Sequence, residues 1–254
     1  MQIDVSDGMS RNIISDDERI DEINENLRLI QKKNGLVFGT DAYLLSAYVK
    51  GKRNAVAADL GSGTGVAAFL LAVKEKAQTV HAYEIQETFA TLIDRNTALN
   101  GLDGRIVTHH TDVREAGIGD IGAECDIVIC NPPYMKRASA IVNDNDTLSV
   151  SRHEILCTLE DVIKTSAELL ISKGRLYMVH RPSRLADIIC LMREYKIEPK
   201  CIRMVAPNSK KEPNLLLIEG MYCGGRELRF MNQLCVFDEN GSYSDEINKI
   251  YGRS

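Results

Sequence analysis

The sequence predicts an α/β fold with a doubly wound, mainly parallel sheet of seven strands, an antiparallel last strand and an N-terminal hairpin. From residue 54 onward, short apolar segments alternate with helical segments, which is the order of a parallel sheet covered on both faces. The last two apolar segments are joined by a short polar stretch containing S-K-K-E-P, which is too short for a crossover helix. We therefore expect these two strands to pair antiparallel.

The N-terminal region is expected to form an acidic leader and a hairpin over residues 1–35, ahead of a single domain over residues 36–254. Residues 1–30 hold eight acidic and three basic side chains. Asn34-Gly35 stands between two apolar stretches, which favours a tight hairpin turn at that point. Disorder is expected for roughly the first dozen residues.

The elements of the main domain follow from the apolar pattern and from the residues that begin and end helices. A first helix, A-Y-L-L-S-A-Y-V, is expected to have Thr40 or Asp41 as its N-cap. A stretch rich in Asn, Asp and Ser, residues 135–153, is expected to form a long loop. The strands are predicted at 55–60, 79–85, 105–112, 125–130, 175–181, 201–207 and 214–223, and the later helices at 66–76, 87–99, 158–173 and 184–195.

Composition and charge exclude several classes of protein. No run of 18 apolar residues is present, and the polar start lacks the pattern of a secretory signal, so we expect a cytoplasmic protein with no membrane partner. The seven cysteines contain no C-x-x-C pair, which favours reduced thiols over a disulfide frame or a metal site. The net charge of −5 is concentrated in residues 1–30, whereas residues 199–230 are mildly basic. A nucleic-acid partner is therefore permitted but not required.

A glycine-rich turn, D-L-G-S-G-T-G, follows the first predicted strand of the domain and opens a helix. Its glycines, Gly61, Gly63 and Gly65, would let the backbone turn tightly and approach a ligand. The turn departs from the dinucleotide pattern G-x-G-x-x-G because Val66 occupies the sixth position. The acidic residue Asp59, two positions before the first glycine, would repel a pyrophosphate and suit a cationic amine.

Acidic residues also mark the ends of the next two predicted strands. Glu84 is placed to hold the hydroxyl groups of a ribose, and Asp112 could accept a hydrogen bond from an exocyclic amine. Each acid alone could be an ordinary surface residue, but the ordered set with Asp59 favours one ligand. An amine, a ribose and an adenine without a phosphate are the parts of S-adenosylmethionine, which we expect as the cofactor.

The fourth predicted strand, C-D-I-V-I-C, stops abruptly at N-P-P-Y. An exocyclic amine on a purine is a poor nucleophile because its lone pair is delocalised into the ring. The side-chain oxygen of Asn131 and the carbonyl of Pro132 could each accept a hydrogen bond from one N–H group of this amine. The two bonds would direct the lone pair of the nitrogen at a methyl donor. The two prolines would fix that carbonyl, and Tyr134 could stack on the base. The alternative is a pair of structural prolines that begin a loop.

These motifs together resemble class I S-adenosylmethionine-dependent methyltransferases, which have a Rossmann-like fold. The order D-L-G-S-G-T-G, Glu84, Asp112 and N-P-P-Y carries this resemblance, and N-P-P-Y is similar to the motif of the branch that methylates planar nitrogens. Three further matches narrow the family that the sequence resembles: the segment L-V-F-G-T-D-A-Y-L-L-S-A-Y-V, the S-R-H-E after the loop and the final N-L-L-L-I-E-G. Residues 20–235 resemble the bacterial adenine-N6 methyltransferases of a valine tRNA, within the methyltransferase small domain group.

The resemblance implies methylation of an adenine N6 amine in tRNA near the anticodon. Methylation of a glutamine amide in a protein such as a release factor remains an alternative, since the same motif serves both. The enzymes of that second kind usually carry a helical substrate domain before the glycine turn, whereas only 58 residues precede Asp59 here. At the start of the first helix, Thr40 and Asp41 could either fold over the cofactor or simply begin the helix.

Overall fold

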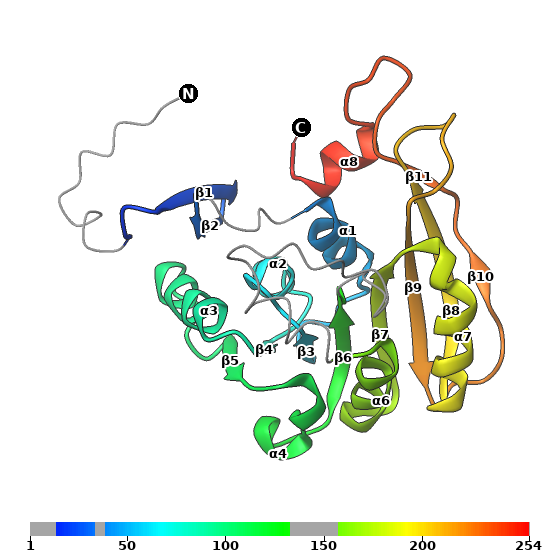
Figure 1. Cartoon of the computed structure of the whole chain (residues 1–254), viewed down its shortest axis with the longest axis horizontal. Helices are drawn as coiled ribbons and strands as arrows, with labels where there is room; N and C mark the ends of the chain where they lie inside the picture. Colours follow the sequence, from blue (N-terminus) through cyan, green and yellow to red (C-terminus); the bar gives the residue numbers. More distant parts are fainter. Residues whose placement is uncertain (1–13, 34–38, 133–156, 254) are drawn as a thin grey trace, which may run out of the picture.

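A mixed sheet lies at the centre of the molecule and contains all seven predicted strands (Figure 1). The computed structural model describes residues 14–33, 39–132 and 157–253. Within these residues the sheet has nine strands in the order β10-β8-β9-β7-β6-β3-β4-β5, with β11 paired to β8. The seven predicted strands are β3 (Val56–Leu60), β4 (Thr79–Glu84), β5 (Ile106–His110), β6 (Cys125–Cys130), β7 (Leu170–His180), β8 (Ile197–Ala206) and β9 (Leu215–Tyr222).

The directions of the strands confirm the doubly wound, mainly parallel arrangement. β3 pairs in parallel with β4 on one side and with β6 on the other, and β5 and β7 extend the sheet in parallel outside them. β9 runs antiparallel to both β7 and β8, as expected from the short link before it. Because the chain leaves β3 toward one side and later returns to the other, a crevice for a ligand is expected where β3 and β6 end.

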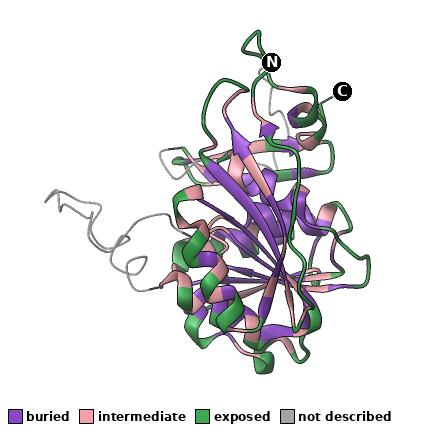
Figure 2. Ribbon diagram, turned by 90° about the vertical axis from the view of Figure 1, so that its right-hand side faces the viewer, coloured by how far each residue is buried: buried purple, intermediate pink, exposed green. Residues whose placement is uncertain are grey.

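Helices cover both faces of the sheet, and successive residues of the central strands pack alternately against the two layers. Ala57 and Ile129 lie in one buried cluster with α1 (Thr40–Tyr48), α2 (Val66–Val73) and α3 (Glu87–Leu99). Ala58 and Val128 lie in a second cluster with α6 (Leu159–Leu169) and α7 (Leu185–Glu194). Figure 2 shows this burial as purple strands between partly green helices.

Short elements complete the described residues. The helix α4 (Ile118–Ile121) precedes β6. After β9 come two short strands, β10 (Arg229–Phe230) and β11 (Leu234–Cys235), and then the helix α8 (Asp245–Ile250), which lies against α1 in Figure 1. No helix among the described residues combines the length and apolar character needed to cross a membrane.

Three predicted helix boundaries are wrong, and one of them is the end of α2, which lies at Val73 and not at residue 76. The N-cap of α1 is Gly39, and Thr40 and Asp41 lie inside the first turn, where the Thr40 hydroxyl accepts a hydrogen bond from Tyr251 and does not cap the helix. The helix predicted to end at residue 173 is α6, which ends at Leu169. Gly174 belongs to β7, where a side chain would come within 3.1 Å of the Cys125 carbonyl oxygen. The same side chain would come within 2.9 Å of the Ile171 carbonyl oxygen of β7 itself, so this glycine permits the local path of β7 beside β6 and does not end a helix.

The N-terminal hairpin expected within residues 1–35 is confirmed. It consists of β1 (Glu18–Asn24) and β2 (Leu27–Lys32), which pair antiparallel. The side-chain oxygen of Asn24 accepts the N–H of Asn26 at 2.9 Å, and this local bond stabilises a turn well before Asn34-Gly35. Asn34-Gly35 lies outside the described residues.

Asn96 of α3 and Asn100, the C-cap residue of that helix, bind the hairpin to the main domain. Asn96 accepts the N–H of Ile30 at 2.6 Å and donates to its carbonyl at 3.2 Å. One helical turn later, Asn100 makes the same pair of bonds with Arg28, at 3.0 and 2.7 Å. Two side chains four residues apart on the helix thus bind two residues of β2 that lie two positions apart. They pair with backbone N–H and carbonyl groups on the edge of β2 that does not pair with β1.

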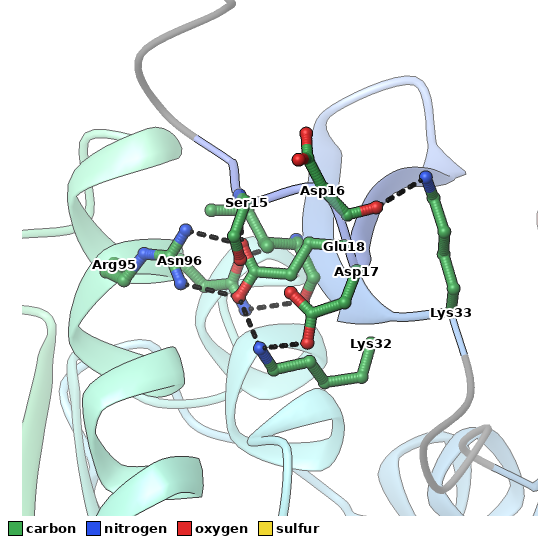
Figure 3. Close-up of polar contacts among 9 residues, drawn as sticks. Ser15, Asp16, Asp17, Glu18, Lys32, Lys33, Arg95 and Asn96 are labelled. Atoms are coloured by element: carbon green, nitrogen blue, oxygen red, sulfur yellow. Dashed lines mark hydrogen bonds and ion pairs between the residues drawn. The ribbon is translucent and has the colours of Figure 1, made fainter.

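A buried carboxylate forms a second attachment between the hairpin and α3 (Figure 3). Glu18 is only 2% exposed, and Arg95 donates to both of its carboxylate oxygens, at 2.8 and 2.7 Å. Lys32 lies 3.2 Å from the same carboxylate, and the Ser15 N–H donates to it at 2.9 Å. Arg95 holds the pKa of Glu18 well below its usual range, so the buried group stays charged and paired.

Replacement of Asn96 by alanine is expected to destabilise the protein by about 2 kcal/mol, since it leaves a buried N–H and a buried carbonyl of Ile30 without partners. Asn100→Ala is the matched control: its bonds to Arg28 are exposed, and water can replace them, so a cost below about 1 kcal/mol is expected. Urea unfolding of the two variants measures both values. Equal costs would show that the buried bonds of Asn96 are not a main attachment of the hairpin.

Candidate active site

The carboxyl ends of four parallel strands surround one cavity of about 290 Å³. It lies at the carboxyl ends of the paired strands β3 and β6, from which the chain continues to opposite sides of the sheet; folds of this class bind ligands at this position. The residues that line it come from the ends of β3, β4, β5 and β6 and from the starts of α1, α2, α3 and α6; they are Gly39, Ala42, Asp59, Leu60, Gly61, Ser62, Gly63, Thr64, Val66, Ala67, Glu84, Ile85, Gln86, Phe89, Asp112, Val113, Cys130, Asn131, Pro132, Cys157 and Val162.

The glycine turn forms one wall of the cavity. Gly61 and Gly63 have positive φ angles of 73° and 55°, which other residues rarely adopt. The N–H groups of Gly61 and Ser62 both donate to the Tyr83 carbonyl, at 3.0 and 2.9 Å, so the turn is held against the end of β4. Gly65 is not a lining residue; a side chain there would lie 2.9 Å from Ile93, so this glycine permits α2 and α3 to pack closely.

Asp59 places an incompletely paired carboxylate in the cavity wall. Its side chain is buried, and its Oδ2 atom has no hydrogen-bond partner within the described part of the chain. Burial, together with a smaller effect of the Glu84 charge, raises the pKa of this carboxyl to about 7, although hydrogen bonds from Ser62 and Ala68 act in the opposite direction. A cationic ligand group beside Oδ2 would supply the missing partner and favour the ionised form.

Glu84 connects the glycine turn to the start of α3. One carboxylate oxygen accepts the N–H of Gly63 at 2.7 Å, and the other accepts the N–H of Gln86 at 2.8 Å. These bonds fix the carboxylate at the end of β4, on the wall of the cavity. Glu84 is 5% exposed, so it is held inside the site and does not act as a surface charge.

Asp112 lies on the cavity wall just beyond the end of β5, where it caps a short 3-10 helix, Val113–Glu115. Arg114 binds its carboxylate with both backbone and side chain: the N–H and Nε donate to Oδ1, at 2.9 and 3.0 Å, and a second guanidinium nitrogen pairs with Oδ2. Sequence analysis did not identify Arg114. The fork geometry fixes the plane of the carboxylate that faces the cavity.

Asn131 and Pro132 follow β6 and line the same cavity as Asp59. The β3–β6 register pairs Asp59 with Ile129 and Leu60 with Cys130, so the end of β6 lies beside the glycine turn. The Cys130 thiol donates to the Leu60 carbonyl at 3.1 Å and joins the two strand ends at their last residues. Tyr134 lies outside the described residues.

The start of α1 contributes Gly39 and Ala42 to the lining, whereas Thr40 and Asp41, the two residues predicted from sequence, are not among the lining residues. Sequence analysis also missed an apolar side of the cavity, formed by Ile85, Phe89, Val113 and Val162. The position of Ile85 directly after a strand-end acid was a usable signal. Cys157 and Val162 come from beyond the long 133–156 segment, and no local pattern marks them.

The chemistry of these groups fits S-adenosylmethionine. The incompletely paired carboxylate oxygen of Asp59 suits an ammonium group, the fixed carboxylate of Glu84 suits ribose hydroxyls, and Asp112 suits an exocyclic amine. Apolar side chains next to these groups suit an adenine ring. Within residues 14–33, 39–132 and 157–253, no cluster of three His, Cys, Asp or Glu side chains could hold a metal ion.

The fold and these strand-end residues define an α/β enzyme with a cofactor site at the switch point of its sheet. The chain belongs to the methyltransferase small domain family, whose model matches residues 33–194.

Curated relatives and a solved structure agree with this assignment. The tRNA1(Val) (adenine(37)-N6)-methyltransferase of Porphyromonas gingivalis is 28% identical over 220 residues, which cover 84% of this chain and 86% of that protein. The protein of the same name from Parabacteroides distasonis is 27% identical over 187 residues, covering 74% and 77%. The crystal structure of a predicted O-methyltransferase from Agrobacterium tumefaciens is similar in fold, with a TM-score of 0.67, 23% identity, and coverage of 84% and 95%.

Proposed function

We propose that this protein transfers a methyl group from S-adenosylmethionine to the exocyclic N6 amine of an adenine in RNA, and that its substrate is a tRNA methylated near the anticodon. The observation that carries the proposal is the position of Asn131 and Pro132, which line the same cavity as the buried carboxylate of Asp59. The names of the curated relatives support tRNA as the substrate. Such an enzyme works in the cytoplasm, on a tRNA loop whose bases are already unstacked.

In this proposal the cofactor site is built from the strand-end acids and the glycine turn. Asp59 pairs with the ammonium group, Glu84 accepts from the ribose hydroxyls, and Asp112, held by Arg114, accepts from the adenine amine of the cofactor. Gly61 and Gly63 give the ligand access to the backbone, and Gly65 keeps α2 and α3 in position. Thr40 and Asp41 act through the start of α1, whose neighbours Gly39 and Ala42 line the cavity.

The bound cofactor would supply an electrophilic methyl group on a sulfonium, so the protein needs to position the nucleophile more than to activate it by proton transfer. The side-chain oxygen of Asn131 and the carbonyl oxygen of Pro132 each accept a hydrogen bond from one N–H group of the target amine. This holds the nitrogen away from conjugation with the ring and presents its lone pair. Tyr134 provides a face for stacking of the target base, worth about 1–3 kcal/mol per base.

The catalytic unit in this proposal is a single domain, residues 36–254, to which the hairpin is fastened through α3. Methylation of a glutamine amide in a protein remains the alternative substrate, because an amide nitrogen is planar and could bind the same two acceptors.

The proposal is tested by incubation of the purified protein with labelled S-adenosylmethionine and, in separate reactions, bulk tRNA or a release factor. Label in the tRNA fraction and none in the protein fraction is the expected result. Label on a glutamine alone would exclude RNA as the substrate. Asn131→Ala run in parallel distinguishes enzymatic transfer from contamination.

A further inference from the structure

The segment after β9 extends from the edge of the sheet to the start of α1. It lies beyond the part of the chain that the family model matches, residues 33–194. β10 and β11 both pair in parallel with β8, Phe230 opposite Ile202 and Cys235 opposite Ala206. The chain then forms α8 beside α1 (Figure 1). We call residues 229–253 the C-terminal strap.

Several independent contacts fix the strap to the domain. Arg203 of β8 binds Glu246 through a two-pronged ion pair, with distances of 2.6 and 2.7 Å. Ile247 is completely buried in the hydrophobic cluster that contains α1 and α2. Lys74, at the end of α2, donates to the Ile250 carbonyl at 3.1 Å. The strap is therefore a packed part of the domain, with its end held next to α1.

Tyr251 connects the strap to the first residue of α1. Its hydroxyl donates to the Thr40 Oγ1 atom at 3.2 Å, and its ring packs edge-on against Tyr43, with centroids 4.7 Å apart at an angle of 70°. The Arg253 guanidinium lies 5.1 Å from the centroid of the Tyr251 ring, which adds a cation–π contact. Tyr251 thus contacts the first turn of α1 with both its ring and its hydroxyl.

The first turn of α1 is also a wall of the cofactor cavity. Gly39, immediately before Thr40, and Ala42, one residue before Tyr43, both line it. The N-cap Gly39 has no side chain to accept a hydrogen bond from the helix, so this end of α1 lacks the usual local restraint. The contacts of Tyr251 with Thr40 and Tyr43 hold the start of α1 in place through a residue that does not belong to the helix.

We propose that the C-terminal strap is a positioning element of the cofactor site, and that Tyr251 is the positioning residue that sets the start of α1 against the cavity. The inference rests on the proposed function only in the identity of the cofactor. Asn131 and Pro132 follow β6 and are not part of α1, so the strap acts on cofactor affinity and leaves the transfer step unchanged.

The test compares Tyr251→Phe, Tyr251→Ala and the control Tyr195→Phe, which also removes one phenol donor, in this case to Glu160 on the α6–α7 side. Titration calorimetry with S-adenosylhomocysteine is expected to show Kd raised about threefold by loss of the hydroxyl and about tenfold by loss of the whole side chain. The KM for the cofactor rises in the same way, kcat stays constant, and the Tm of Tyr251→Phe stays within about 2 °C of wild type.

The outcomes separate this inference from the proposed function. Wild-type protein that binds S-adenosylhomocysteine, together with Tyr251→Phe and Tyr251→Ala variants of unchanged Kd, would overturn the inference and leave the proposed function intact. A Kd change in Tyr195→Phe as large as that in Tyr251→Phe would also overturn it, because the effect would then be one of general stability. Wild-type protein that binds no cofactor would overturn both.

Discussion

Replacement of Asn131 by alanine is expected to lower kcat by about 10²–10³-fold, the usual loss when one preorganised polar group is removed from a transition-state site. The variant lacks the side-chain oxygen that accepts an N–H bond of the target amine, so the lone pair stays conjugated with the ring. The affinity for the cofactor should change little, since its charged and polar groups bind Asp59, Glu84 and Asp112 in this account. Single-turnover transfer and calorimetry on the same preparation separate the two effects.

Asn208→Ala is a suitable control for this experiment. Asn208 lies in the turn between β8 and β9, where its side chain accepts the Lys210 N–H at 3.1 Å, and it is not a lining residue of the cavity. Its kcat should equal that of the wild type. An Asn131→Ala variant with near-normal turnover would contradict the proposal that Asn131, at the end of β6, positions the target amine.

Replacement of Asp59 by asparagine is expected to weaken cofactor binding strongly while it stabilises the apo protein. The variant cannot pair a charge with the ammonium group, and a loss in affinity of about 100-fold or more follows for a buried charge pair. In the apo protein the same carboxyl is buried with an unpaired Oδ2 atom, and its pKa is raised to about 7. Removal of its charge should therefore stabilise the apo protein by about 2 kcal/mol at pH 8, or raise Tm by about 5 °C.

The raised pKa of Asp59 also predicts the direction of two pH effects. The folded protein holds this proton up to about pH 7, whereas the unfolded chain releases it near its ordinary pKa of 3.8. The apo protein therefore loses stability as pH rises through this interval, and the loss is complete above pH 7. Cofactor binding needs the carboxylate, so its affinity should fall as pH drops below about 7.

Asp126→Asn serves as the control for both measurements. Asp126 lies at the start of β6, where it accepts the Val56 N–H at 3.0 Å, and it does not line the cavity. Calorimetric titration from pH 5.5 to 8.5 and thermal unfolding of the apo proteins provide the data. A cofactor affinity that is independent of pH, or an Asp59→Asn variant that binds normally, would contradict the assignment of Asp59 to the ammonium group.

The centre of the sheet was predictable because the apolar pattern of each segment and the alternating order of strands and helices indicate the same fold there. β3 and β6 are short apolar runs, and the polar residues Asp59, Glu84 and Asn131, at or just after the ends of β3, β4 and β6, belong to the site. Parallel strands bring their carboxyl ends to one edge, so consecutive strand ends in the sequence become neighbours in space. For this reason seven of the predicted site residues line one cavity: Asp59, Gly61, Gly63, Glu84, Asp112, Asn131 and Pro132.

Other features depended on contacts between distant parts of the chain and could not be predicted locally. The Asn96 and Asn100 side chains look like ordinary helix residues until β2 docks beside them, some 70 residues away in sequence. Thr40 was predicted as a possible helix cap, but its hydroxyl accepts a bond from Tyr251 at the other end of the chain. Gly174 resembles a helix stop, but a side chain there would lie 2.9 Å from the Ile171 carbonyl oxygen and 3.1 Å from the Cys125 carbonyl oxygen, which only the folded β6 and β7 reveal.

The central claim is that two acceptors at the end of β6 present an exocyclic amine to the methyl donor. Nucleoside mass spectrometry of bulk tRNA, after incubation with the protein and a cofactor that carries a deuterated methyl group, tests this claim most directly. The account predicts label in N6-methyladenosine, and its loss with Asn131→Ala. Label in 1-methyladenosine, in 2-methyladenosine or on a ribose hydroxyl would contradict it, since none of those positions is an exocyclic amine.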